Sequence, residues 1–139
     1  MVTCTCVKVA SLRKQGYTDL EQWINTPGNM LVTRRGRIWI TDPVTKEKRI
    51  FHYPESPWHN PFKLDPSIKD PAMKAQDLQN SLNNYVAHLI QEGVWDKEHL
   101  QVLSGKNLGC FCQKQWDHNG IPLCHAAMLV WGCNQVGIN

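Results

Sequence analysis

Lys106-Asn107-Leu108-Gly109-Cys110-Phe111-Cys112 is the stretch that decides the fold, and eleven residues separate its last cysteine from Cys124-His125, which precedes an apolar run to Trp131. The first segment has the composition of a buried strand. Proline before the second segment and Gly132 after it predict a helix whose first turn holds Cys124 and His125. The unit is therefore a strand ending in cysteines, a loop, and a helix beginning with Cys-His.

Upstream of this unit, helix and strand patterns alternate. Small apolar and β-branched residues predict a strand over residues 2–10, followed by a polar turn over residues 11–16. Thr18 and Glu21 have the spacing of a capping box, so a short helix is expected to run to about Asn25. Further strands are predicted over residues 30–33, 37–41 and 48–53, the last two forming a β-hairpin around a turn at 42–45.

The longest predicted element is a helix that begins at Asp70-Pro71 and ends at Gly93. Its apolar residues recur at spacings of three and four: Leu78, Leu82, Tyr85, Val86, Leu89 and Ile90. Asp96 can cap a short helix after it. Helices between the first and last strands predict a single α/β domain over residues 1–139, a small layered sheet with flanking helices and an inserted β-hairpin.

Composition is that of an ordinary folded protein. The chain has 139 residues, of which 42% are hydrophobic and 19% charged, which is enough apolar material for one core. Neither a signal peptide nor a membrane-spanning run is evident, so we expect a cytoplasmic, reducing location without membrane contact. The six cysteines are then expected to be free, to bind metal or to react, rather than to form disulfides.

The cysteine-rich unit permits three interpretations. Cys110, Cys112, Cys124 and His125 could together supply four zinc ligands, although paired cysteines in closed zinc sites are usually two to four residues apart. Alternatively, the helix start lowers the pKa of Cys124 and attracts anions, which makes Cys124 a candidate nucleophile and His125 a candidate proton carrier. The third interpretation is that the cysteines only fill the core.

A proline-rich segment between residues 54 and 71 is the second candidate region. Asn60 precedes Pro61 and is therefore biased toward an extended backbone. Trp58 and Phe62 can anchor this loop while the Asn60 amide and the Lys63 ammonium stay exposed, a pair suited to a phosphate or a nucleobase edge. We expect this loop and the Cys124 helix start to form one pocket.

The predicted hairpin carries most of the basic character of a chain whose formal net charge is +3. Its cations stand among aromatic residues, an arrangement that can hold a nucleic acid because cations meet phosphates while rings stack on bases. An edge hairpin protected by its charges from aggregation is the simpler alternative.

Residues throughout the chain resemble one family. The matching segments are Ser11-Leu12-Arg13-Lys14, Trp58, Asn60-Pro61-Phe62-Lys63, Leu108-Gly109-Cys110-Phe111-Cys112 and Cys124-His125. Together they resemble the uncharacterised domain of unknown function four-three-two-six, whose members occur in bacteria, phages, eukaryotes and viruses. The resemblance is compatible with a viral protein and implies no established activity.

The preferred hypothesis is binding or processing of a small anionic, nucleotide-like or other phosphate-bearing ligand. The residues expected to contact it are Arg13, Arg34, Trp58, Asn60, Lys63, Cys110 and Cys112, with Cys124 and His125 as the candidate catalytic pair. The alternatives are a zinc-stabilised protein-interaction module and an RNA- or DNA-binding accessory protein that acts through the hairpin. No Gly-rich phosphate loop, paired-carboxylate site or serine triad is present, so the sequence leaves enzymatic activity open.

Overall fold

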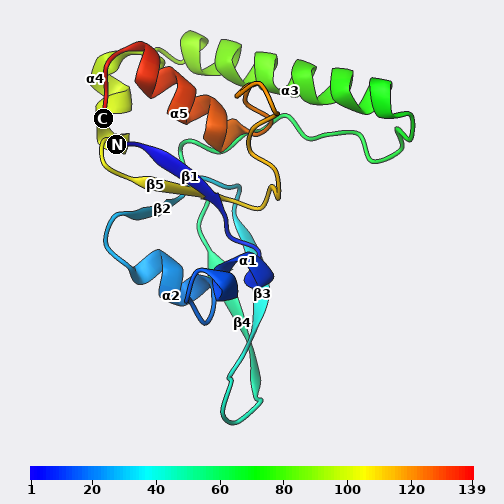
Figure 1. The fold of residues 1–139 in the computed structure, drawn as a ribbon, viewed down its shortest axis with the longest axis vertical. Helices are drawn as coiled ribbons and strands as arrows, with labels where there is room; N and C mark the ends of the chain where they lie inside the picture. The colour runs from blue at the N-terminus through cyan, green and yellow to red at the C-terminus, as the bar shows by residue number, and fades with distance from the viewer.

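Three parallel strands form the central sheet of the computed structural model, which describes residues 1–139 (Figure 1). The strands are β1 (Thr3–Cys6), β5 (Asn107–Cys110) and β2 (Asn29–Leu31), in the spatial order β1-β5-β2. The last strand in the sequence therefore lies in the middle of the sheet. The α/β prediction is confirmed, and the 106–112 stretch supplies the central strand.

Strand β5 is buried because both faces of the sheet are covered. Leu108 and Cys110 are fully buried on the face that packs against the larger core cluster. Gly109 points the other way, where an added Cβ would lie 2.5 Å from the Trp23 ring. The glycine thus lets Trp23 approach the sheet, as expected of a parallel strand covered on both sides.

Helices form a layer on each side of this sheet (Figure 1). One layer contains the elements α3 (Pro71–Gln91), α4 (Lys97–Leu100), the 3-10 turn η1 (Gln101–Leu103) and α5 (His125–Gln135). The other contains the short helices α1 (Val9–Lys14) and α2 (Leu20–Asn25). Trp23 and Leu12 centre a smaller core cluster beneath this second layer.

The inserted hairpin is confirmed as a separate two-stranded sheet, β3 (Gly36–Thr41) and β4 (Lys48–Tyr53). Figure 1 shows it projecting away from the central sheet on the side of α1 and α2. Ile38, Phe51 and Tyr53 pack toward the smaller cluster. The hairpin therefore has one packed face and one free face.

Helix α3 follows its prediction closely. Pro71 stands in its first turn, and the Asp70 carboxylate accepts hydrogen bonds from the Ala72 and Met73 amides at 2.8 and 3.1 Å. Leu82, Tyr85 and Leu89 are buried. Ile90 was wrongly included in the apolar stripe, because its side chain is 58% exposed.

The first predicted strand was too long. It ends at Cys6, and residues 9–14, in part predicted as a turn, form helix α1. Tertiary packing explains the difference. Leu12 is fully buried in the smaller cluster, and the helical conformation of residues 9–14 places it there.

The ends of three other elements also differ from their predictions. Asp19, not Thr18, caps α2 by accepting the Gln22 amide at 2.9 Å, and strand β5 stops at Cys110. Helix α5 continues through Gly132 to Gln135. Gly132 is needed for close packing, because an added Cβ would lie 2.4 Å from the Trp95 ring, and so it does not end the helix.

Candidate functional site

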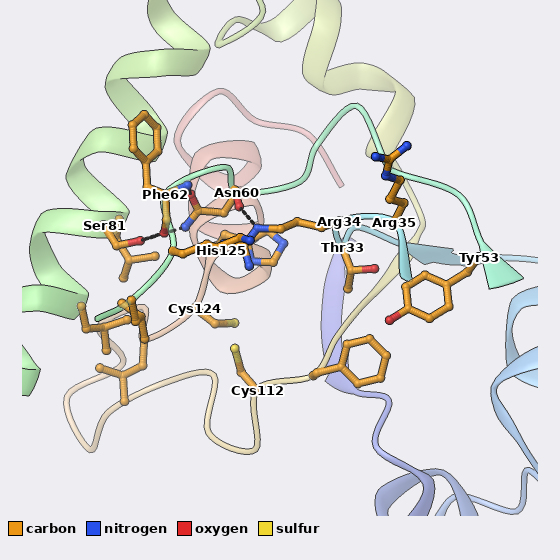
Figure 2. A pocket seen from close by; sticks show the side chains of 16 residues that line it. Thr33, Arg34, Arg35, Tyr53, Asn60, Phe62, Ser81, Cys112, Cys124 and His125 are labelled. Atoms are coloured by element: carbon orange, nitrogen blue, oxygen red, sulfur yellow. Dashed lines mark hydrogen bonds between the residues drawn. The ribbon is translucent and has the colours of Figure 1, made fainter. Parts of the chain in front are cut away.

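The candidate site lies beyond the carboxyl ends of the three parallel strands, where such folds usually bind ligands. Lys8 follows β1, Thr33 and Arg34 follow β2, and Cys112 follows β5. The start of α5 faces the same region. Together with the loop before α3, these segments enclose a cavity of about 610 Å³ (Figure 2).

Two thiols, those of Cys112 and Cys124, line this cavity, and the Cys110 thiol lies behind them. The Sγ atoms of Cys110, Cys112 and Cys124 all lie within 4.8 Å of one another, and Cys110 and Cys124 are 3.6 Å apart. Cys110 and Cys124 are buried, whereas Cys112 is partly exposed, and Figure 2 shows the Cys112 and Cys124 sulfurs facing each other. Gln115 fixes the loop by donating to the Cys112 carbonyl at 2.6 Å.

The cluster favours one negative charge, located on Cys112. The neighbouring thiols of Cys110 and then Cys124, helped by the positive charge of Lys8, lower the pKa of the Cys112 thiol to about 3. The proximity of Cys112 raises the pKa of Cys110 to about 12, and the proximity of Cys110 and Cys112 raises the pKa of Cys124. Cys112 therefore loses its proton first, while Cys110 and Cys124 stay thiols.

Cys124 lies at the N-cap of α5, one position before the first turn in which it was predicted. Its sulfur accepts a hydrogen bond from the Ala127 amide at 3.5 Å. A thiol that caps a helix and is only 2% exposed is held in place on two sides. The neighbouring thiols and burial raise the pKa of Cys124 despite the amide hydrogen bond, and this makes Cys124 a poor nucleophile.

His125 lies beside the thiols without joining them. Its Nε2 atom hydrogen-bonds to the Val32 carbonyl, and its ring packs edge-on against Tyr85 with centroids 5.5 Å apart. Burial lowers the pKa of His125, so the ring is neutral and Nε2 carries the proton that it donates. The ligand atoms that lie within 4.8 Å of one another are the three sulfurs alone, so the four-ligand zinc set that includes His125 is not assembled.

The proline-rich loop is anchored to α3. Trp58 is only 8% exposed, and its carbonyl accepts a hydrogen bond from the Tyr85 hydroxyl at 2.6 Å. The side-chain NH2 of Asn60 donates to the Ser81 hydroxyl at 3.1 Å, and the side-chain oxygen Oδ1 accepts from the backbone amide of Phe62 at 2.9 Å. The prediction of an exposed Asn60 amide is wrong, because both ends of that amide hold the loop in shape.

Three cations line the cavity and no carboxylate does. Arg34 donates from Nε to the backbone carbonyl of Asn60 at 2.7 Å. Figure 2 shows the Arg34 side chain extending across the cavity toward Asn60 and His125. Arg35 and Lys63 are exposed at the rim. The electrostatic character of the cavity is therefore positive.

Two hydroxyl groups in the cavity escaped the sequence analysis. Thr33 is 8% exposed, and its Oγ1 atom is buried without a hydrogen-bond partner. Burial raises the pKa of Tyr53, so its hydroxyl, which Figure 2 shows directed into the cavity, stays a donor. The position of Thr33 directly before Arg34 at a strand end was the available signal, whereas Tyr53 arrives from the hairpin.

Three residues predicted to contact the ligand do not line this cavity, namely Arg13, Trp58 and Cys110. Arg13 lines a second cavity of about 510 Å³ between α1 and the hairpin, not the cavity above the thiols. On the hairpin, Arg37 and Trp39 share the free face, and Trp39 is 66% exposed. Arg49 instead forms an ion pair with Glu21, with N and O 2.6 Å apart. The structure therefore separates the basic hairpin face from the thiol cavity.

Residues 18–135, most of the chain, match the family described as a domain of unknown function (DUF4326). The chain belongs to this family. The resemblance of the chain to this family is thereby confirmed. No curated protein and no solved structure matches the DUF4326 chain. None of its helices combines the length and the apolar character needed to cross a bilayer.

Proposed function

We propose that the cavity of this DUF4326 protein binds a small phosphate-bearing, nucleotide-like ligand. The observation that carries the proposal is a cavity lined by Arg34, Arg35 and Lys63 and by no carboxylate. A cavity of this volume suits a ligand of nucleotide size. Three cations against the single negative charge of Cys112 leave the cavity lining positive, which favours an anion.

The polar groups suggest where each part of the ligand binds. Arg34 uses Nε for the Asn60 carbonyl, and its terminal nitrogens can donate to a phosphate. The buried Thr33 hydroxyl lacks a partner and can bind a ligand oxygen. Apolar side chains that include Phe62 and Phe111 offer surface for a sugar or a base.

Binding is better supported than catalysis by the predicted pair. Cys124 is buried, and the neighbouring thiols raise its pKa, which disfavours the thiolate that a nucleophile needs. Processing of the ligand therefore remains a proposal that depends on binding first.

Thermal unfolding in the presence of candidate ligands tests the proposal. Inorganic phosphate, a nucleoside and the corresponding nucleoside mono- and diphosphates would be compared at one ionic strength, with sodium chloride as the reference. A ligand at about 100 times its Kd stabilises the folded state by about 2.7 kcal/mol. The expected order is diphosphate above monophosphate above nucleoside, and equal melting temperatures for all additions would refute the proposal.

A zinc-stabilised interaction module is the second candidate, and the three clustered thiols favour it. Sulfur ligands from Cys110, Cys112 and Cys124 suit zinc. Elemental analysis of purified, reduced protein, followed by unfolding with and without a chelator, tests it. Stoichiometric zinc and a lower melting temperature after chelation support this candidate.

RNA or DNA binding through the hairpin is the third candidate. The exposed Trp39 ring with Arg37 on the same face favours it. Binding of single-stranded oligonucleotides should weaken as salt rises. A Trp39→Ala variant that binds as well as the parent chain would exclude this surface.

A further inference from the structure

We infer that Cys110, Cys112 and Cys124 form a three-thiolate site for a soft divalent metal ion whose fourth coordination position opens into the cavity. The ion and the ligand would then meet at one place. The ligand half of this inference rests on the proposed function. The metal half rests on the thiol geometry alone.

The spacing of the sulfurs suits one tetrahedral ion. With metal–sulfur bonds of about 2.3 Å, sulfurs on a tetrahedral ion are about 3.8 Å apart. The Cys110 and Cys124 sulfurs are 3.6 Å apart, and all three sulfurs lie within 4.8 Å of one another. Only the position of Cys112, on the loop after β5, has to adjust.

No further side chain is placed to close the site. The ligand atoms that lie within 4.8 Å of one another are the sulfurs of Cys110, Cys112 and Cys124, and neither a ring nitrogen of His125 nor the Cys4 sulfur belongs to this group. No Asp or Glu lines the cavity. The protein therefore supplies three ligands, the number typical of zinc sites that keep an open position.

The open position faces the cavity because of where the three thiols lie. Cys112 and Cys124 line the cavity, whereas Cys110 lies behind them on the central strand, with its sulfur 3.9 Å from the Thr5 carbonyl. Three thiolates on a divalent ion carry one net negative charge. Lys8, which lies near Cys112, and Arg34, which lines the same cavity as Cys112 and Cys124, offset that charge and let an anionic oxygen approach.

Titration with Cd²⁺ tests the metal half on the full-length, reduced protein. We expect one Cd²⁺ per chain, with thiolate-to-metal charge-transfer absorption. Cys112→Ser should lose at least two thirds of the tight binding capacity, and because Cys112 is only partly buried, this variant is expected to fold. Cys133→Ser is the matched control, since Cys133 is a core thiol outside the cluster.

The outcomes of this titration distinguish a metal site from cysteines that only pack in the core. Absence of charge-transfer absorption would mean that the cysteines serve as core packing, and the inference fails. It fails equally where Cys112→Ser binds Cd²⁺ as tightly as the parent chain. Circular dichroism of each variant shows that any loss reflects the site rather than the fold.

Co²⁺ tests the open position, because its visible spectrum responds to a change of ligand. Imidazole, a small neutral ligand, should alter the spectrum of the Co²⁺-loaded protein, and inorganic phosphate should do so with higher affinity in the parent chain than in Arg34→Gln. A spectrum that responds to neither indicates a closed site and overturns the inference. A response to imidazole without any response to phosphate or thermal protection by phosphate overturns the proposed function and leaves the open metal site standing.

Discussion

Arg34 is the residue through which the cavity recognises charge. Its Nε atom is fixed by the Asn60 carbonyl, so the guanidinium is held in place before a ligand arrives. A pre-positioned guanidinium loses little entropy on binding a phosphate. Arg35 and Lys63, both exposed, contribute mainly long-range attraction.

Arg34→Gln should therefore weaken binding of the phosphate ligand. A hydrogen bond to a charged group contributes about 1.5–3 kcal/mol, which corresponds to about a 10- to 150-fold increase in Kd measured by calorimetry. Arg37→Gln removes the same charge from the hairpin and should change Kd less than about twofold. An equal increase in Kd for both substitutions would show that the phosphate ligand is attracted by the overall charge of the protein and not bound in the cavity.

His125 gives stability a pH dependence of known sign. In the folded state, burial lowers the pKa of His125 below its ordinary value of 6.5. Near and below pH 6.5 the unfolded chain therefore binds more protons than the folded chain. The stabilising contribution is therefore complete above about pH 6.5 and is lost as the pH falls toward the folded-state pKa. Urea unfolding between pH 7.5 and 5.5 should show the decrease.

His125→Gln should remove this component, because the glutamine amide does not titrate and can still donate to the Val32 carbonyl. His118→Gln is the control, since His118 is exposed on the loop before α5. The pH dependence of His118→Gln should match that of the parent chain. A parent-like slope in His125→Gln would assign the pH effect to other groups.

At the scale of elements, hydrogen bonds to α3 fix the position of the loop over residues 58–63. The Asn60 amide is 9% exposed and bonds to Ser81 and to the Phe62 backbone. These side-chain bonds fix the position of the Asn60 backbone carbonyl, which accepts the hydrogen bond from Arg34 Nε. The loop acts on the ligand through Arg34.

Asn60→Ala should lower the free energy of unfolding by about 1–3 kcal/mol, because Ser81 and the Phe62 amide lose a buried partner. Ligand affinity should fall in parallel as Arg34 loses its support. Asn84→Ala, at an exposed position on α3, should change neither quantity. Unaltered stability with lost affinity would instead indicate that Asn60 contacts the ligand directly.

Packing of α2 on the central strand depends on Gly109. Gly109→Ala places a Cβ 2.5 Å from Trp23 and 2.7 Å from Val7, and overpacking of this kind costs about 1–3 kcal/mol in unfolding free energy. Trp23→Leu in the same chain should recover part of that loss, because it removes the ring that collides. A double-mutant cycle by urea unfolding measures the coupling, and strictly additive effects would argue against the collision.

At the scale of the whole molecule, strand β5 joins the two halves of the core. Leu108 and Cys110 contribute to the larger cluster, and Gly109 between them lies against Trp23 of the smaller one. Neither cluster can lose this strand without exposing the other. The two helical layers therefore form one cooperative unit.

The chain should accordingly unfold in one transition. Far-ultraviolet circular dichroism and tryptophan fluorescence are expected to give coincident urea curves. Gly109→Ala should shift both curves equally. Earlier loss of one signal would show that the layer of α1 and α2 unfolds separately, in contradiction of a single domain.

The sequence by itself determined those features that depend on neighbours along the chain. Period and capping residues predicted α3, the hairpin and the final strand-loop-helix unit, because local hydrogen bonding and amphipathic spacing set them. The Cys-x-Cys…Cys-His spacing placed Cys110 and Cys112 on one segment and Cys124 at a helix start, and left open whether the loop brings them together; in the structure their three sulfurs do meet.

Only the tertiary structure decided what each side chain does there. Packing against Tyr85 and Val32 turned His125 away from the thiols, burial of Leu12 converted a predicted turn into α1, and Ser81 took up the Asn60 amide. Thr33 and Tyr53 joined the cavity from distant segments. These contacts link residues far apart in the chain, and spacing along a sequence carries no information about which distant group will satisfy a buried polar atom.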